Sequence, residues 1–408
     1  MDFSKIRNFL LTVTTVMIFL NLTDFVPGFR TFPLPGYFVD IFIFLFLFIF
    51  YKRYHIRLPF NHIAVVFLVY YVIINTIYFA LSPTGLGEIT EFKTIIFYIL
   101  IFLYILMYLN LDDDNLTHIR KIMIFISFIA VATLGVDFVS DGYFQNMTEE
   151  GRLEFIPGRA ASSFVNANIA GGAISIFLIF AIDLIPVRLR TPYILFLFVG
   201  LLFTMSRSNI IIFAVLLMIL FFQRKLKATQ LVGTFMATVL LMLWLSFGGI
   251  ETIEHSFGVE FNQGIKDRIN FFVDKDRIDS DLHSVNERSE ALEHALKMFL
   301  DKPITGNGFA ATRTWDFNVS PHNTYAMHWA EFGLLGMTFV PLYLFWASRN
   351  VFRYGSRSQR QFALLVIIYI VLSCMFSHNM LHQKLNIAIV LAVAIMGYKS
   401  KNRFLSAR

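Results

Sequence analysis

Cysteine and charge are both scarce in this sequence. Charged residues make up 15% of its 408 positions, whereas a soluble domain carries about 25%. The single cysteine, Cys374, lies in an apolar run, so no disulfide bond can form within the chain and the loops must hold their shape without one. The net charge of +6 follows from membrane orientation and therefore predicts no nucleic-acid partner.

Motifs for bound metals and for ATP are missing as well. The loops expected outside the membrane carry no HExxH sequence and no cluster of His and Cys residues, and the chain has no Walker motif. We therefore expect a site that works without a metal ion or other cofactor.

Long apolar runs dominate what is present. Hydrophobic residues make up 57% of the chain and the mean hydropathy is +0.64. These values predict an all-α polytopic membrane protein with about twelve transmembrane helices. We place the helices near residues 8–24, 37–51, 60–81, 91–109, 119–138, 168–185, 191–205, 208–222, 229–248, 323–347, 361–377 and 383–398.

The runs at 191–205 and 208–222 are separated only by Ser206 and Arg207. We expect a break there, because a merged helix would invert everything that follows and place the Arg349–Arg360 cluster outside. With the break, both termini are cytoplasmic and most lysine and arginine residues lie inside, as the positive-inside rule requires.

This topology predicts three parts: helices one to nine at 1–248, a large periplasmic loop at 249–322, and helices ten to twelve at 323–408. A loop of that length is a functional element or a small domain. Within it, residues 286–300 have helical periodicity, and we expect this helix to lie along the membrane interface. Gly306 and Gly308 predict a turn after it. The expected apolar face of the helix is Ala291, Leu292, Ala295, Leu296 and Phe299.

Two arginines are candidates for binding an anion at the outer rim. Arg207 stands at the predicted break, where an arginine is either functional or a snorkelling anchor among lipid phosphates. Arg288 begins the interfacial helix, where the alternative is a solvated ion pair with Glu287 or Glu290. Arginine suits the functional role because its planar fork binds phosphate oxygens through two hydrogen bonds.

A polar stretch before the sixth predicted helix adds further candidates. Arg159 is one of few cations expected outside and is assigned to the phosphate site, with Asn166 and Asn168 as hydrogen-bonding partners of a sugar. The alternative is a purely structural helix entry. In that case Asn168 caps the helix, and Gly171 and Gly172 let a neighbouring helix pack closely.

His322 enters the tenth predicted helix from the polar loop, at a wet interface. It is a candidate general base for an acceptor hydroxyl, although a lone histidine there is more often structural. His328 lies two turns deeper and is interpreted as structural. His378 stands at another outer rim and is a candidate for lining the same pocket.

Together these residues resemble the O-antigen ligase/O-antigen polymerase superfamily of bacterial inner-membrane glycosyltransferases. The resemblance rests on the Ser206-Arg207 rim motif, the loop helix bearing Arg288, the segment 303–308, and the block 322–336, in which His322-Asn323 is followed by Glu331-Phe-Gly333-Leu-Leu-Gly336. It covers about residues 159–336.

The resemblance implies a GT-C-like membrane fold and a donor glycan on undecaprenyl pyrophosphate. Arg207 and Arg288 would hold the pyrophosphate and His322 would activate the acceptor hydroxyl, with Asn323 and Tyr325 as further substrate-binding residues. The enzyme would be a metal-independent inverting glycosyltransferase of lipopolysaccharide biosynthesis, in the inner membrane with its active site facing the periplasm.

The acceptor stays open at this point. We place an O-antigen ligase, which uses lipid A-core, ahead of an O-antigen polymerase, which uses a second lipid-linked glycan. A protein O-oligosaccharyltransferase or a polyisoprenoid-glycan transporter ranks lower. A transporter predicts ionisable residues at mid-membrane and repeated halves, and the sequence shows few mid-helix charges and no repeat.

Overall fold

The computed structural model describes residues 3–22, 63–81, 113–140, 143–146, 158–257, 266, 278–312, 321–377, 380–381 and 383–406. The described residues form helices joined by turns and contain no β-strand, as expected for an all-α protein. The predicted helices at 37–51 and 91–109 and the candidate His378 lie outside them. The chain packs as two compact units, unit 1 (1–36 and 113–281) and unit 2 (37–112 and 282–408), and each is described by itself.

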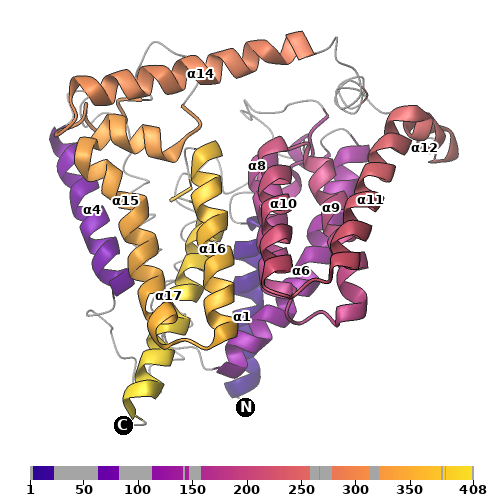
Figure 1. The fold of residues 1–408 in the computed structure, drawn as a ribbon, viewed down its shortest axis with the longest axis horizontal. Helices are drawn as coiled ribbons and strands as arrows, with labels where there is room; N and C mark the ends of the chain where they lie inside the picture. The colour runs from indigo at the N-terminus through magenta and orange to yellow at the C-terminus, as the bar shows by residue number, and fades with distance from the viewer. Residues whose placement is uncertain are drawn as a thin grey trace. The chain divides into compact units, whose positions relative to one another are not determined.

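Helix α8 is the centre of unit 1. Of its 15 residues, 13 are buried, as expected for a helix that is hydrophobic on every side. Small residues let its neighbours approach: a Cβ atom on Gly171 would lie 2.8 Å from the Asn209 amide nitrogen on α10. Helix α8 packs against α6, α9 and α10, and Figure 1 shows it beside α10. The helices are α1 (Phe3–Phe19), α6 (Asp113–Val139), α7 (Tyr143–Asn146), α8 (Ala167–Ala181), α9 (Arg190–Thr204), α10 (Arg207–Phe222), α11 (Ala228–Trp244) and α12 (Ile250–Phe257), with short helical turns at Ser162–Phe164, Val187–Leu189 and Leu245–Gly249.

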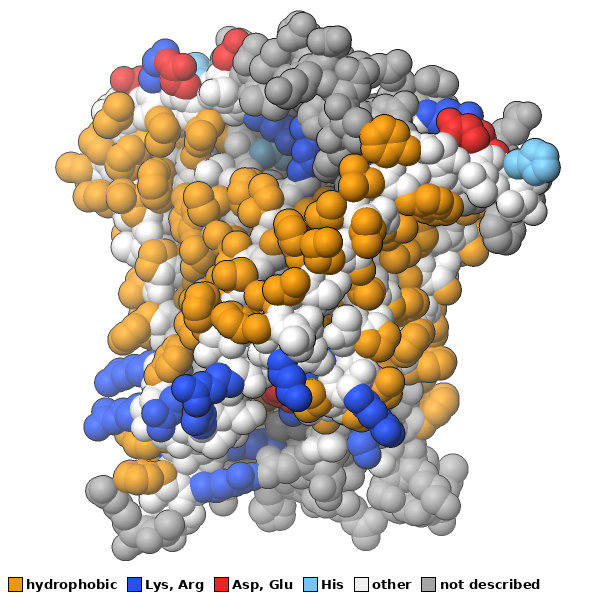
Figure 2. Space-filling view, turned by 45° about the vertical axis from the view of Figure 1, so that its right-hand side comes forward, with side chains coloured by type: hydrophobic (Ala, Val, Ile, Leu, Met, Phe, Trp, Pro, Cys, Tyr) orange, Lys and Arg blue, Asp and Glu red, His pale blue; other side chains and the backbone are white. Residues whose placement is uncertain are grey.

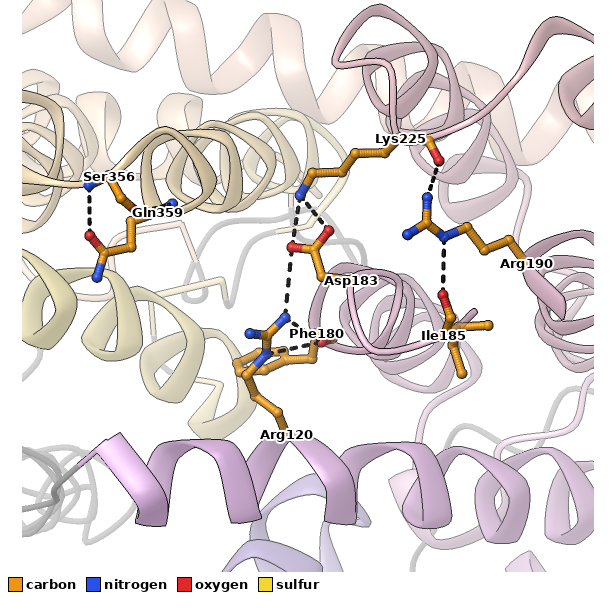
Figure 3. A network of polar contacts seen from close by, with 8 residues as sticks. All are labelled: Arg120, Phe180, Asp183, Ile185, Arg190, Lys225, Ser356 and Gln359. Carbon is orange, nitrogen blue, oxygen red and sulfur yellow. Dashed lines mark hydrogen bonds and ion pairs between the residues drawn. The ribbon is translucent and has the colours of Figure 1, made fainter. Parts of the chain in front are cut away.

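One end of unit 1 is closed by an ionic network (Figure 3). The Asp183 carboxylate, just after α8, accepts from the Lys225 ammonium at 2.7 and 2.8 Å and lies 3.7 Å from the Arg120 guanidinium. Arg120 also donates to the Phe180 carbonyl at 3.4 Å, and Arg190 donates to the carbonyls of Ile185 and Lys225. Cations thus bind carbonyl groups in the last turn of α8 and in the turns that follow α8 and α10.

Unit 2 is built on the packing of α15 against α17, with α16 and α4 beside them. A Cβ atom on Gly397 of α17 would lie 2.8 Å from the Val351 nitrogen of α15, so these two backbones approach closely. Ser356 begins α16 with a capping box, in which its hydroxyl and the Gln359 side chain each bond the other's backbone N–H (Figure 3). The helices are α4 (Ile63–Leu81), α14 (Ile278–Asp301, in this unit from Leu282), α15 (Thr324–Tyr354), α16 (Arg357–Phe376) and α17 (Lys384–Ser406).

Basic side chains of unit 2 gather where α15 gives way to α16 and where α17 finishes. The end of α17 lies beside the junction of α15 and α16. The ring centroids of Tyr354 and Phe404 are 5.3 Å apart, and the Ser400 hydroxyl donates to Gln359 at 3.0 Å. Figure 2 shows Lys and Arg side chains next to the hydrophobic surface of the helices. The cations at this end are Arg349, Arg353, Arg357, Arg360, Lys399, Lys401 and Arg403.

Four described helical segments are long and apolar enough to cross a membrane by length and composition alone. Each apolar run predicted on described residues coincides with a helix, and the number of twelve crossings stays a prediction. The long and the shorter apolar helices together support a membrane protein. The four segments are Thr117–Val139, Val187–Thr204, Thr324–Tyr354 and Arg357–Phe376.

Helix α15 is broken at Gly333, a feature that the sequence analysis did not predict. Gly333 has φ 56° and ψ −137°, which few residues other than glycine adopt. The predicted turn at 303–308 fills the break: Asn307 and Gly308 donate backbone N–H bonds to the carbonyls of Ala330 and Glu331 at 2.9 and 3.0 Å, and Leu334 donates to Pro303 at 2.8 Å. The turn therefore satisfies the backbone groups that the break releases.

Helix α14 packs its alanine face against the start of α15. Ala291 and Ala295 are completely buried, and Ala295 packs with Ala326 and Ala330 of α15. Leu296, which was predicted on the same apolar face, is 37% exposed, because it points away from the small-residue contact. In Figure 1, α14 runs roughly horizontally, whereas α16 and α17 run roughly vertically.

We predict that Gly306→Ala destabilises the protein. Gly306 has φ +68°, and an added Cβ atom would lie 2.2 Å from the Glu331 carbonyl oxygen. The free energy of unfolding should fall by about 2 kcal/mol or more. Gly233→Ala in α11 is the matched control, since an added Cβ atom there meets nothing within 4 Å in the described structure. Thermal unfolding in detergent compares the two, and equal melting temperatures would contradict the role of the turn.

Candidate functional site

The break between α9 and α10 is confirmed, and it carries Arg207. Met205 ends α9 in the left-handed conformation with φ 48° and ψ 31°, and Ser206 is extended. Arg207 is the first residue of α10, and its side chain is exposed. A left-handed residue followed by an extended one turns the chain, so one long helix becomes two with an arginine at the turn.

Arg159 lies against the same turn. Its Nε donates to the Thr204 carbonyl at 3.2 Å, and the backbone N–H of Ala160 donates to the Phe203 carbonyl at 2.9 Å. Both carbonyls belong to the last turn of α9, where helix carbonyls lack intrahelical partners and the helix dipole favours a cation. Arg159 therefore stabilises the turn that carries Arg207.

Asn168 joins the loop, α8 and α10 through hydrogen bonds. Its side-chain oxygen accepts from the Arg159 Nη2 at 2.7 Å and from the Ser206 hydroxyl at 2.8 Å. Asn209 donates its amide to the Asn168 carbonyl at 2.8 Å and to the Ser206 hydroxyl at 2.9 Å. The oxygen of Asn168 is thus used within the protein, and its contact with a sugar stays a prediction.

The prediction that Asn168 caps α8 is wrong by two residues. The N-cap is Asn166, whose side-chain oxygen accepts from the Asn168 backbone N–H at 2.7 Å. Asn166 is extended and precedes the first helical residue, which is the geometry that capping requires. The close approach expected at Gly171 is confirmed, because the Asn209 side chain of α10 lies against it.

Asp137 was missed by the sequence analysis. It is 1% exposed near the end of α6, and its carboxylate accepts from the backbone N–H groups of Ala161, Ser162 and Phe144 at 2.9, 2.8 and 3.0 Å. An acidic residue near the end of an apolar helix was the available signal. Its partners were not predictable, since backbone donors from α7 and from the loop before α8 leave no pattern in the sequence.

In unit 2, His322 precedes α15 and is partly buried with a left-handed φ of 44°. Asn323 is the N-cap of the helix, and its side chain accepts from the Ala326 N–H at 3.0 Å. The Tyr325 hydroxyl donates to the Val371 carbonyl of α16 at 3.3 Å, and the Thr324 hydroxyl donates to the Ser377 carbonyl. The entry to α15 is therefore anchored on α16, which holds the backbone at His322.

Arg288 is exposed on α14, one turn before Ala291 on the face that packs against α15. Residues nearer the N-terminus of α14 contact residues nearer the start of α15. Phe299 lies beside Trp329 with ring centroids 6.0 Å apart, and Ala295 packs with Ala326. Arg288 continues this face in the direction of His322.

Asn307 fixes the end of α14 on α15. Its side-chain amide donates to the Met298 carbonyl of α14 at 2.8 Å and to the Ala330 carbonyl of α15 at 2.9 Å. Glu331, 4% exposed, accepts from the Thr312 hydroxyl at 2.6 Å. Asn307 thus positions α14, Gly333 allows the break that the turn fills, and Glu331 holds Thr312 after the turn. The sequence indicated the importance of these motif residues without their roles.

Left-handed residues are concentrated at the candidate site. Of the seven described non-glycine residues with positive φ, four lie within three positions of a candidate residue. Strained backbone of this kind persists only where surrounding contacts enforce it, and such sites are often functional. The four residues are Ser162, Val165, Met205 and His322.

The structure thus brings the candidates together in two groups. Arg159, Asn166, Asn168 and the Arg207 turn form one group in unit 1, while the Arg288 face and His322 with Asn323 and Tyr325 lie in unit 2. Within the described ranges, no group of three His, Cys, Asp or Glu residues could hold a metal ion. A single site that contains both groups stays a prediction.

A comparison with protein families finds a match to part of the chain. Residues 192–340 match the family model described as O-Antigen ligase. The match includes the α9–α10 turn, Arg207, Arg288, the turn at 303–308, His322 and the break in α15. The predicted resemblance to the O-antigen ligase and polymerase superfamily is therefore confirmed over these residues. No curated protein matches the chain.

Proposed function

We propose that the protein is a glycosyltransferase that moves a glycan from undecaprenyl pyrophosphate to an acceptor hydroxyl. We further propose that it is an O-antigen ligase and that the acceptor is lipid A-core. The observation that carries the proposal is the family match over residues 192–340, which contains Arg207, Arg288 and His322. The site would face the periplasm from the inner membrane, with both termini in the cytoplasm and a GT-C-like arrangement of about twelve helices.

The proposed reaction is one inverting displacement. The acceptor oxygen attacks the anomeric carbon, His322 takes its proton, and the bond from that carbon to the pyrophosphate oxygen breaks. The undecaprenyl pyrophosphate leaves with the bonding electrons. Arg207 and Arg288 stabilise its charge, because guanidinium groups bind phosphate oxygens through paired hydrogen bonds. The step needs neither a nucleotide nor a metal ion.

The local structure at Arg207 supports an anion there. The hydroxyl of Ser206, the N-cap of α10, is used on Asn168 instead of capping the helix. The first N–H groups of α10 and the positive end of its dipole therefore lie at the helix start that carries Arg207, an arrangement that favours phosphate. Arg159 adds a second guanidinium behind the turn.

The polymerase is the alternative, because the same residues would serve a second lipid-linked glycan as acceptor. A protein O-oligosaccharyltransferase differs only in the acceptor. A transporter is less well supported, since the buried acids are engaged within the protein: Asp137 binds backbone N–H groups and Glu331 binds Thr312. Ionisable groups of a transport path would line a cavity instead.

We predict that Arg288→Ala lowers transfer at least about 100-fold, since it removes charge stabilisation from the leaving group. Lys297→Ala is the matched control, because Lys297 is a cation on the same helix that is 66% exposed and paired with Glu293 at 3.0 Å. Transfer from a lipid-linked donor in membranes compares the variants at equal protein levels. Equal losses in both, or none in Arg288→Ala, would contradict the assignment.

A deletion strain separates ligase from polymerase. Loss of a ligase should leave bare lipid A-core and accumulated lipid-linked polymer, whereas loss of a polymerase should leave lipid A-core with a single repeat. The lipopolysaccharide and the lipid-linked pool are analysed by gel and mass spectrometry, with the gene restored on a plasmid as control. Long chains still attached to lipid A-core would exclude both functions.

A further inference from the structure

The Asp137 carboxylate is buried, and its burial would cost free energy without hydrogen-bond donors around it. The residue is 1% exposed, and both of its oxygens accept backbone hydrogen bonds: one from Phe144, the other from Ala161 and Ser162. Burial of a carboxylate is tolerated when hydrogen bonds replace its hydration. This acid is part of no substrate contact proposed above, so it has another role.

The donors from Ala161 and Ser162 come from a specialised backbone geometry. Ala161 has φ −122° and ψ −22°, and Ser162 is left-handed with φ 49°. Successive N–H groups in such a pair point to one place and form an anion-binding concavity. Here the chain's own Asp137 oxygen occupies it, with N–H distances of 2.9 and 2.8 Å. The carboxylate thus stabilises a loop conformation that would otherwise be unfavourable.

The same loop binds the end of α9. Ala160 and Arg159, the residues directly before the concavity, donate to the Phe203 and Thr204 carbonyls at 2.9 and 3.2 Å. Directly after Thr204 the chain turns through Met205, and two residues further on it reaches Arg207. A continuous set of contacts therefore leads from Asp137 through the loop to the turn that presents Arg207.

We infer that Asp137 is a positioning residue: by fixing the loop at 159–162, it fixes the α9–α10 turn and with it the Arg207 guanidinium. The effect on pyrophosphate binding rests on the proposed function, whereas the effect on the turn does not. Asp137 acts through backbone contacts and touches no substrate.

Hydrogen–deuterium exchange of the full chain in detergent tests the effect on the turn. In Asp137→Asn an amide NH₂ replaces one carboxylate oxygen and opposes backbone donors. Peptides covering 158–165 and 200–208 should exchange faster than in the wild type. Asp183→Asn is the matched control, because Asp183 is an ion-paired acid at the opposite end of unit 1, and it should leave both segments unchanged.

Loosening of 158–165 without any change at 200–208 would overturn the inference. If Asp137→Asn fails to fold, Arg159→Leu provides the same test. It removes the contacts to Thr204 and Asn168 but keeps the backbone donors of Ala161 and Ser162 that bind Asp137. Faster exchange at 200–208 is again expected, and unchanged exchange there would reject the inference.

A double-mutant cycle with Arg207→Lys tests the consequence for activity. Asp137→Asn should lower kcat/KM for the lipid-linked donor about 10-fold or more, because small displacements of a binding group are costly. In the Arg207→Lys background the same change should have much less effect, since the two residues act as one unit. Multiplicative losses would show that Asp137 does not act through Arg207.

The two measurements separate the two claims. If the wild type transfers no glycan from the lipid-linked donor, the proposed function fails, and the exchange data still decide whether Asp137 positions the turn. If the wild type transfers glycan and Asp137→Asn matches it, the positioning inference fails and the proposed function stands.

Discussion

Backbone polar groups that become unpaired where a membrane helix breaks must find partners within the protein, and this constraint governs both units. At Gly333 the freed groups of α15 bind the turn at 303–308. At the end of α9 the freed carbonyls of Phe203 and Thr204 bind Ala160 and Arg159. In lipid each unpaired group would cost several kcal/mol, so each break requires a loop that fits it.

The two breaks also determine where the candidate residues lie. In unit 1 the loop that caps α9 brings Arg159 to the turn that carries Arg207. In unit 2 the turn that fills the α15 break holds the end of α14, which carries Arg288, while Asn323 and Tyr325 anchor the backbone beside His322. Groups that stabilise developing charge are effective when they are held in place before the reaction. Rigid breaks at helix ends provide that rigidity.

The helices were largely predictable from the sequence, because apolar runs of membrane length are a strong signal. The break at Ser206-Arg207 followed from the positive-inside rule, because a merged helix would have placed the Arg349–Arg360 cluster outside. The break at Gly333 did not, since it lies inside an apolar run and depends on a turn about 25 residues earlier in the chain. Asp137 and the role of Asn307 were missed for a related reason: the partners of both side chains are backbone groups, which every residue carries. Asn168 was recognised in the sequence as a polar candidate, but its hydrogen bonds to Arg159 and Ser206 were not predicted.

The most direct test of the central claim is a reconstituted transfer reaction. The purified full-length protein is placed in liposomes with a glycan on undecaprenyl pyrophosphate, lipid A-core and EDTA, without nucleotide. The account predicts a glycosylated acceptor with an inverted anomeric centre and one undecaprenyl pyrophosphate released for each transfer, both lost in His322→Ala. Retention of configuration, or transfer that requires a nucleotide sugar or a metal ion, would contradict it.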